Sequence, residues 1–192
     1  FFVSGNEGIT QSTLFGLNYA DKWGKKWDVS GSYFFSDANN TNNSNTNRLF
    51  VTGGGLGDLG LRYTEESEQT NYSQQHRFGS RLEWNIDSND RVIMQPRITY
   101  QTSDQNLPTL GVSQTTDYSQ IISLMNNVFK NESSSINGAF EIDWLHAFDK
   151  KGRSLAIEFI PSWNNTGGTS LLDNRLFRSA DSTIRQQETQ LN

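Results

Sequence analysis

The sequence predicts an all-β protein, an antiparallel up-and-down meander of about six to seven long strands. Two observations carry this prediction. Apolar and polar residues alternate strictly along several segments, which is the two-residue period of a strand with one apolar and one polar face. The connections between these segments alternate between short and long, as expected when strands run up and down one sheet.

The composition agrees with strands and excludes several classes of protein. Only 33% of the residues are hydrophobic, yet there are 12 Phe, 6 Tyr and 5 Trp, and aromatic residues favour strands. A net charge of −5 argues against a nucleic-acid-binding protein. The absence of Cys excludes disulfides and thiolate metal sites. No apolar run is long enough for a transmembrane helix, but the strands of a membrane barrel never form such a run.

The alternation defines the elements in order along the chain. We predict strands at residues 9–21, 27–36, 73–86, 91–102, 134–148 and 154–164, and the start of another near residue 183. Long polar loops are predicted at residues 37–72, 103–133 and 165–182. The apolar positions Phe148 and Leu155 differ in parity, so the turn between them should hold an even number of residues, with Lys151 and Gly152 at its centre.

One segment departs from the strand pattern. After Thr116 and Asp117, two residue types that cap helices, apolar residues recur with helical spacing. These are Ile121, Leu124, Met125 and Val128. The spacing predicts a short helix over residues 117–131, inside the second long loop.

The placement of aromatic residues favours a transmembrane barrel. One group lies near the short turns and comprises Tyr19, Trp23, Trp27, Trp84, Trp144 and Phe148. A second group lies near the long loops and comprises Tyr33, Phe35, Phe78, Tyr100 and Trp163. Two aromatic bands on either side of an aliphatic middle are expected at the two interfaces of a membrane. The predicted fold is therefore an arc of an outer-membrane β-barrel, with short turns on one side and long loops on the other.

A soluble β-sandwich, binding glycans or another protein, is the alternative because its strands also alternate. Pro96 and Pro161 favour the sandwich, since each removes a hydrogen-bond donor in the middle of a predicted strand. A β-structured surface enzyme is a third and weaker hypothesis, because the sequence holds no catalytic constellation.

Several blocks of the sequence resemble a known family. They are GITQSTLFGLNYADKWGKKWDVSGSYFFSD, HRFGSRLEWNIDSNDRVIMQPRITYQ and FDKKGRSLAIEF, spread over residues 8–159. They are similar to the β-barrel of an outer-membrane family that is related to TonB-dependent receptors and is found in Gram-negative bacteria. These blocks are strand and turn signatures, specific for the barrel type and not for a ligand.

The resemblance implies a non-catalytic role in transport or in the cell envelope, at the outer membrane of a Gram-negative cell. It implies a barrel of about twenty or more strands, preceded by a carboxypeptidase-regulatory-like domain and a plug. Residues 1–192 would then be one incomplete barrel domain. The expected partners are the outer-membrane lipid bilayer and a TonB-type energising protein that would act through N-terminal parts; the ligand is not specified.

We expect the polar strand face to line the barrel interior and the aromatic residues to lie at the lipid interfaces. The predicted lumen-facing residues are Arg77, Arg81, Glu83, Arg97, Glu141, Asp143 and Glu158. The predicted interfacial aromatic residues are Trp23, Trp27, Tyr33, Trp84, Tyr100, Trp144 and Trp163. Glu141, Asp143 and Glu158 also suit a glycosidase carboxylate pair, but a patch of paired lumen charges is the simpler interpretation.

Two other candidate motifs yield no predicted site. His76 and His146 both fall on the apolar face near strand ends, without further metal ligands around them. Gly55, Gly57 and Gly60 match the dinucleotide motif G-x-G-x-x-G, but no helical pattern follows them. We interpret these glycines as part of a long outer loop, and we predict no catalytic residue, cofactor or metal.

Overall fold

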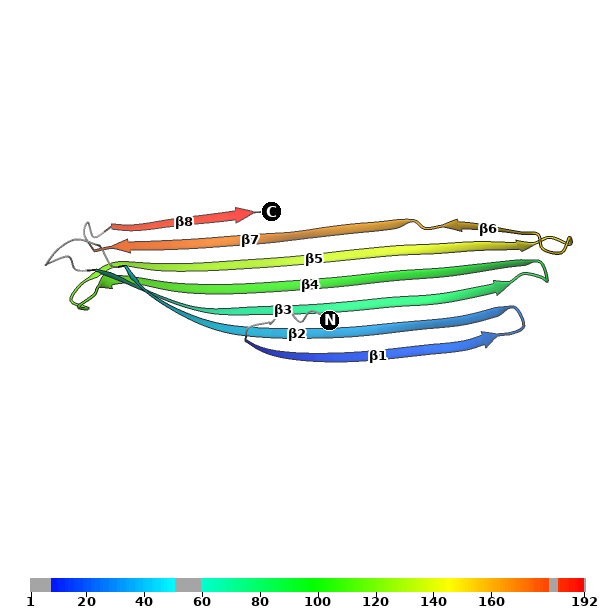
Figure 1. The fold of residues 1–192 in the computed structure, drawn as a ribbon, viewed down its shortest axis with the longest axis horizontal. Helices are drawn as coiled ribbons and strands as arrows, with labels where there is room; N and C mark the ends of the chain where they lie inside the picture. The colour runs from blue at the N-terminus through cyan, green and yellow to red at the C-terminus, as the bar shows by residue number, and fades with distance from the viewer. Residues whose placement is uncertain (1–7, 51–59, 180–182, 192) are drawn as a thin grey trace.

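The computed structural model describes residues 8–50, 60–179 and 183–191, and these form one antiparallel sheet of eight strands (Figure 1). The strands are β1 (Ile9–Trp23), β2 (Trp27–Phe50), β3 (Leu61–Asn85), β4 (Asp90–Thr115), β5 (Ile121–Ala147), β6 (Ser154–Phe159), β7 (Ser162–Arg178) and β8 (Thr183–Leu191). The order across the sheet is β1-β2-β3-β4-β5-β7-β8, and β6 pairs with β5 in line with β7. The predicted all-β meander is confirmed.

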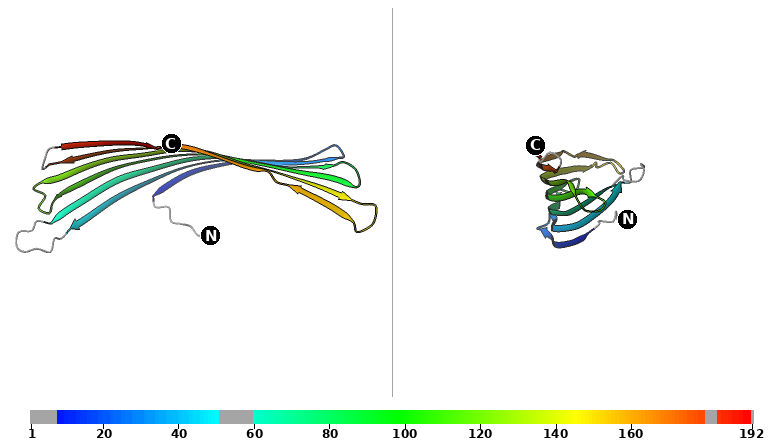
Figure 2. Two further views of the ribbon diagram at one scale, coloured as in Figure 1. Left: turned by 90° about the horizontal axis from the view of Figure 1, so that it is seen from above. Right: turned by 90° about the vertical axis from the view of Figure 1, so that its left-hand side faces the viewer.

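The sheet is a single layer that curves and twists along its length, with no second layer of described residues over either face (Figure 2). Among the hydrophobic residues described, only Val29 and Ile93 are buried. Many large apolar side chains are exposed; Phe15 is 56% exposed and Phe159 is 61% exposed. This part of the chain therefore has no conventional core, and its apolar surface needs a partner outside the sheet.

The register assigns every strand residue to one of two faces. We call the face that carries Trp27 the tryptophan face and the opposite one, which carries Arg97, the arginine face. Trp27 pairs with Trp84, and Val92 pairs with both Trp84 and Trp144, so the alternating apolar residues of neighbouring strands share the tryptophan face. The division into an apolar and a polar side that the alternation predicts therefore holds across the sheet.

The strands are far longer than predicted, and most of the predicted long loops are strands. Residues 37–50 and 61–72 continue β2 and β3, and residues 103–115 and 121–133 continue β4 and β5. The third predicted loop, residues 165–182, contains most of β7. The strand bounds differ because the extension of β2 is largely polar on both faces, and the apolar residues in the extensions of β4, β5 and β7 do not alternate regularly. The two-residue period therefore disappears while the backbone ladder continues.

Polar side chains hold these extensions together across strands. Asn40 donates a hydrogen bond to Thr10 at 2.7 Å, and Ser170 donates one to Asn131 at 2.6 Å. Pairs of this kind replace the apolar contacts of the remaining sheet. The sheet thus has a segment with one apolar face beside the short turns and an extension beyond it in which polar residues occur on both faces.

The predicted helix over residues 117–131 is wrong. Residues 116–120 form a turn, in which Tyr118 has a positive φ of 58° and Ser119 donates its backbone N–H to the Asp117 carboxylate at 3.1 Å. The strand β5 follows, with Leu124 and Met125 on opposite faces. Asp117 therefore stabilises a turn, a role that the same residue type plays as often as helix capping.

Each of the three prolines interrupts pairing between strands. The β3–β4 ladder stops at Gly79–Arg97 and resumes at Leu82–Met94, on either side of Pro96. A second gap in the same ladder spans Pro108, and Pro161 separates β6 from β7. Proline has no N–H to donate, so the neighbouring strand loses a hydrogen bond at each position. The predicted strand at residues 154–164 is accordingly two strands.

The turn between β5 and β6 has the expected parity but not the expected length. Ala147 pairs with Ser154, which leaves six residues in the connection, and Phe148 donates its N–H to Arg153 at 3.1 Å. Gly152 has a φ of 81°, which glycine adopts without strain. The even count confirms the register, while the two-residue turn predicted at Lys151 and Gly152 is a longer one.

The residues that the structure describes form no helix, so none is present that could cross a membrane. Residues 51–59, which hold Gly55 and Gly57, lie outside the described residues, so the predicted loop there is untested. Gly60 is described, and the strand β3 follows it. A dinucleotide motif would require a helix at this point.

Candidate functional site

Tryptophans form a row across the tryptophan face at the short-turn end of the sheet. Trp23 pairs with Trp27, and Trp27 pairs with Trp84. The rings of Trp27 and Trp84 are stacked, with centroids 5.3 Å apart and an interplanar angle of 2°. Trp144 continues the row on β5, where its indole N–H donates to the Asp90 carboxylate at 2.9 Å. A row of this kind, apolar at the ring and polar at the N–H, suits a membrane interface.

A second aromatic band crosses the same face on the side of the polar extensions. Tyr33 pairs with Phe78, and Phe35 pairs with His76, which in turn pairs with Tyr100. The Tyr33 hydroxyl and His76 Nδ1 are 2.7 Å apart. Trp27 and Phe35 are eight positions apart on β2, about 26 Å along the strand. The residues from Trp27 to Phe35 number nine, at the lower end of the about 9–11 that a tilted strand needs to cross a bilayer.

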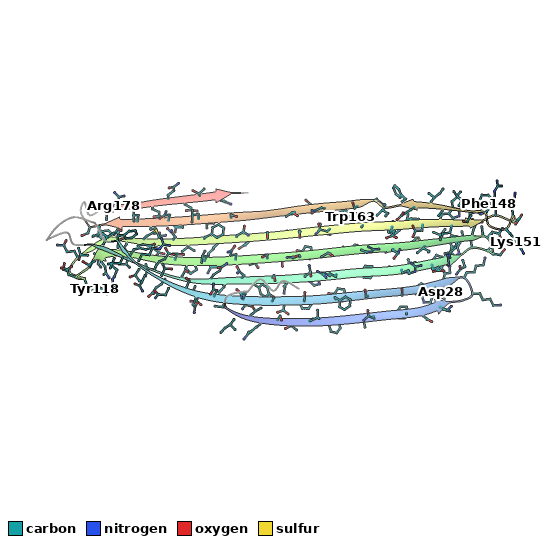
Figure 3. All side chains as sticks on the ribbon, viewed as in Figure 1. Asp28, Tyr118, Phe148, Lys151, Trp163 and Arg178 are labelled. Carbon is teal, nitrogen blue, oxygen red and sulfur yellow. The ribbon has the colours of Figure 1, made fainter. Side chains whose placement is uncertain are left out.

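All seven predicted interfacial aromatic residues therefore lie on one face, in two bands. Figure 3 places Trp163 well away from the short-turn end, where Asp28, Phe148 and Lys151 lie. Both histidines also lie on this face, as predicted: His76 is in the second band, and His146 Nδ1 is 2.9 Å from the Asp90 carboxylate. Around neither histidine do the described residues gather a set of metal ligands.

The arginine face carries the charged residues that were predicted to face the lumen. All seven occupy this face by register: Arg77, Arg81, Glu83, Arg97, Glu141, Asp143 and Glu158. They come from β3, β4, β5 and β6 and lie opposite the apolar band. A polar face at the same level as an apolar one is what a barrel wall with a wet interior requires.

Ion pairs join neighbouring strands on this face. Glu83 accepts from Arg81 and Arg91, each at 3.2 Å. Glu141 accepts from Arg97 at 2.9 Å and from the Gln95 amide at 2.9 Å. The two glutamates are about one-fifth exposed, whereas the arginine side chains are 45–63% exposed. Each glutamate therefore anchors a guanidinium whose other N–H groups remain open to solvent.

Glu141, Asp143 and Glu158 lie close together, as the sequence suggested. Their carboxylate oxygens fall within 4.8 Å of one another. Asp143 and Glu158 are direct partners across β5 and β6, and neither forms an ion pair with any described residue. Glu141 is already held by Arg97 and Gln95. The group is an acidic patch in which Glu141 has the basic partner Arg97.

Two hollows accompany the proline gaps in the β3–β4 ladder. The first, of about 520 Å³, lies by Pro96 on the arginine face and is lined by Arg81 and Arg97 with Ser30 and Ser32; we call it the arginine hollow. The serines, glycines and arginines that line it come from β2, β3 and β4, and β1 contributes Asn18, Tyr19 and Ala20. Sequence analysis named its arginines but not the hollow, because alternation gives the face of a residue and not its depth.

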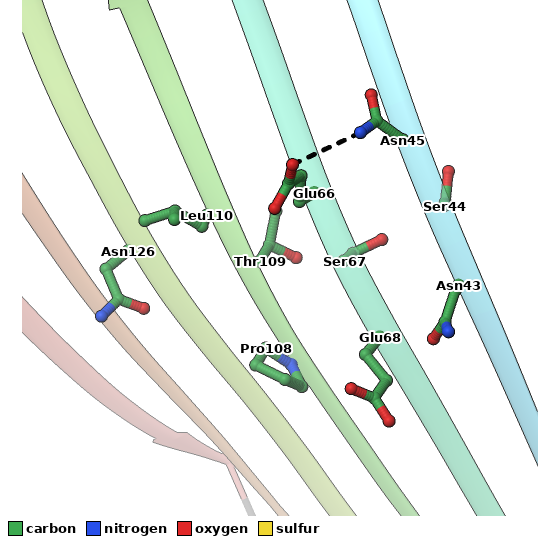
Figure 4. Close-up of a pocket in the computed structure, with 10 residues that line it drawn as sticks. All are labelled: Asn43, Ser44, Asn45, Glu66, Ser67, Glu68, Pro108, Thr109, Leu110 and Asn126. Carbon is green, nitrogen blue, oxygen red and sulfur yellow. Dashed lines mark hydrogen bonds between the residues drawn. The ribbon is translucent and has the colours of Figure 1, made fainter.

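The second hollow, of about 530 Å³, lies by Pro108 on the polar extension of the tryptophan face (Figure 4). We call it the outer groove. Its residues are Asn43, Ser44, Asn45, Glu66, Ser67, Glu68, Pro108, Thr109, Leu110 and Asn126. Asn45 donates a weak hydrogen bond of 3.4 Å to Glu66. Sequence analysis missed this groove because it assigned all of these residues to loops.

Comparisons with known proteins assign no identity to this arrangement. No family model matches the chain, and no curated protein is significantly similar to it.

Proposed function

We propose that this chain is part of the wall of an outer-membrane β-barrel of the TonB-dependent-receptor-like kind, with a role in transport or in the envelope of a Gram-negative cell. The observation that supports this proposal best is the pair of aromatic bands on one face of a single-layer sheet. The apolar strip between the bands has no protein layer over it among the described residues. Lipid would cover that strip, and the arginine face would line the interior.

The mechanism is one of structure and not of covalent chemistry. In hydrocarbon a backbone N–H or C=O finds no partner, so the strands must satisfy one another. Six consecutive pairings, and the pairing of β6 with β5, do this across the described sheet. Among the described residues, β1, β6 and β8 each pair on one side only. Further strands would pair with these edges to close the barrel, since a barrel has no edge.

The polar strand extensions would stand beyond the membrane. β2 has 24 residues, about 80 Å of strand, of which the apolar band uses roughly a third. The remaining residues are polar on both faces and would continue the wall into the medium outside the cell. A tall wall of this kind holds the barrel mouth far from the bilayer, where solutes first meet the protein.

Membrane fractionation of the full-length protein tests this function. We expect it in the outer-membrane fraction, extracted only by detergent, with a heat-modifiable migration on gels. The soluble β-sandwich glycan- or protein-binding module remains the second candidate, because a second sheet packed on the apolar strip would satisfy the same surface. A water-soluble, cooperatively folded full-length protein would establish that alternative and refute the barrel.

A further inference from the structure

Three arginines of the arginine face surround one glycine. Gly79 on β3 pairs directly with Arg97 on β4. Arg77 and Arg81 lie two positions before and after Gly79 and therefore point to the same face. Direct partners and second neighbours in a sheet have Cα atoms within about 7 Å, so the three arginines flank Gly79 on one face. Arg81 and Arg97 line the arginine hollow itself, and Arg77 lies beside it on β3.

That space is open. A methyl group added at Gly79 would meet only the Ser32 hydroxyl within 4 Å, at 3.8 Å. The arginine hollow occupies this position, with the side chains of Ser30, Ser32 and Asn18 around it. No carboxylate is among the residues that line it. The hollow thus offers hydroxyl and amide groups together with guanidinium N–H donors.

The nearby glutamates do not neutralise the three arginines. Arg81 shares Glu83 with Arg91, and Arg97 shares Glu141 with Gln95. Arg77 forms no ion pair with any described residue. Of the two arginines that line the hollow, Arg81 therefore has only a share of one carboxylate, and Arg97 has one that also accepts from an amide. The net positive charge beside the hollow remains available to a ligand.

We propose that the arginine hollow binds an anionic group, a carboxylate, phosphate or sulfate, on a solute that contacts this face. Guanidinium groups bind such oxyanions through paired N–H donors, and the two serine hydroxyls and the Asn18 amide supply further donors. A free inorganic anion and an acidic substituent on a saccharide present the same chemistry. That the hollow lines a passage rests on the proposed function, whereas anion binding rests on the arginines alone.

The test measures binding of radiolabelled inorganic phosphate to the full-length protein by equilibrium dialysis at low ionic strength. Arg77→Gln removes the arginine that holds no carboxylate, so it leaves no acidic group unpaired. Arg77→Gln/Arg81→Gln/Arg97→Gln removes the whole site. Arg153→Gln is the matched control, because this arginine lies in the turn between β5 and β6, away from the hollow.

We expect saturable phosphate binding that Arg77→Gln weakens about tenfold, that the triple variant abolishes, and that Arg153→Gln leaves unchanged. Glu141→Gln gives an independent check if the triple variant does not fold, because it frees Arg97 and should tighten binding several-fold. In every variant that binds phosphate, a higher salt concentration should weaken that binding. Absence of saturable binding, or equal binding by the triple variant, would refute the proposal.

Competition identifies the source of the anionic group. If the natural ligand is an acidic saccharide, a trisaccharide of uronic acids should displace labelled phosphate at lower concentration than unlabelled phosphate does, and its neutral counterpart should not. If unlabelled phosphate competes better, the site binds the free anion. Membrane fractionation of each variant is measured separately. An outer-membrane protein that binds no phosphate would refute the anion site alone, whereas a soluble protein that binds phosphate would refute the proposed barrel alone.

Discussion

The indole of Trp163 lies directly over Gly138, its partner across β5 and β7. A methyl group built on Gly138 would come within 1.9 Å of Trp163 Cζ2. Glycine has no side chain to cover its backbone, and the aromatic ring of the neighbouring strand covers it instead, as is known for glycines in sheets. The pair lies in the second aromatic band, so it joins a residue of the proposed lipid interface to the wall behind it.

Gly138→Ala is therefore expected to displace the Trp163 ring and to destabilise the protein by about 1–3 kcal/mol, as overpacking does. Gly167→Ala is the matched control, because a methyl group there meets nothing within 4 Å. Urea unfolding of the full-length protein in detergent measures both. In a double-mutant cycle, Gly138→Ala should cost less when Trp163 is already alanine. Additive effects would show that the ring does not cover the glycine.

A charge placed on either face of β5 tests the assignment of the faces. Ile142 lies in the apolar band on the tryptophan face, and its neighbour Asp143 lies on the arginine face. Ile142→Arg should cost about 2–4 kcal/mol if that face meets hydrocarbon. Asp143→Arg should be mild, because the new guanidinium lies beside Glu158. Equal costs in an unfolding titration, or a greater cost for Asp143→Arg, would refute the assigned faces.

Alternation was sufficient to predict the faces, because one apolar and one polar side leave a two-residue period in the sequence. All fourteen residues assigned to the lumen or to the interfaces, from Trp23 to Trp163, lie on the expected face. Parity also predicted the register of the turn that follows β5. The faces and the turn parity depend only on which residues point to the same side of a strand, and that follows directly from their positions in the sequence.

Strand length and local depth could not be predicted in this way. Between Asp37 and Phe50 both faces of β2 are polar, so no period marks the strand. Ile121, Leu124, Met125 and Val128 divide between two faces of β5 at a spacing that a helix shares. The outer groove includes Pro108, and the arginine hollow lies over small residues of β2 and β3, so locating either requires knowledge of which strands are neighbours.

The five tryptophans provide a test of contact with lipid. All five lie on the tryptophan face, four near the short turns and Trp163 in the second band. In vesicles, their fluorescence should be quenched more by lipids brominated near the headgroup than by lipids brominated near the chain end. Ile142→Trp in a protein without the native tryptophans should show the reverse order. A protein quenched by neither lipid would not have this face in a membrane.

The turn after β3 should loosen in acid. The backbone N–H groups of Asn89 and Asp90 each donate to the Asp87 carboxylate at 2.8 Å, and they lower its pKa below the ordinary value of 3.8. A depressed pKa means that these bonds contribute stability above the unfolded value and lose it as the pH falls through the folded value. At neutral pH the turn therefore has the full stabilisation from these two hydrogen bonds.

Hydrogen exchange of the Asn89 and Asp90 amides, expressed as protection factors, measures this effect between pH 6 and acid pH below about 3. Protection should fall with acid in the native protein. Asp87→Asn keeps an oxygen acceptor but cannot ionise, so its protection factors should be lower at pH 6 and nearly independent of pH. A native protein whose protection does not change with acid would show that the carboxylate does not order this turn.

Single cysteines test the height and the direction of the wall, since the chain contains no native cysteine. Asn43 lies on the polar extension of β2 and Ser88 lies in a short turn at the opposite end of the sheet, and both are exposed. A membrane-impermeant maleimide added to intact cells should label Asn43→Cys, and should label Ser88→Cys only after the outer membrane is permeabilised. The reverse result would place the extension in the periplasm. Labelling of both in intact cells would mean that no membrane separates the two ends, and the proposed barrel would then fail while the sheet itself remained.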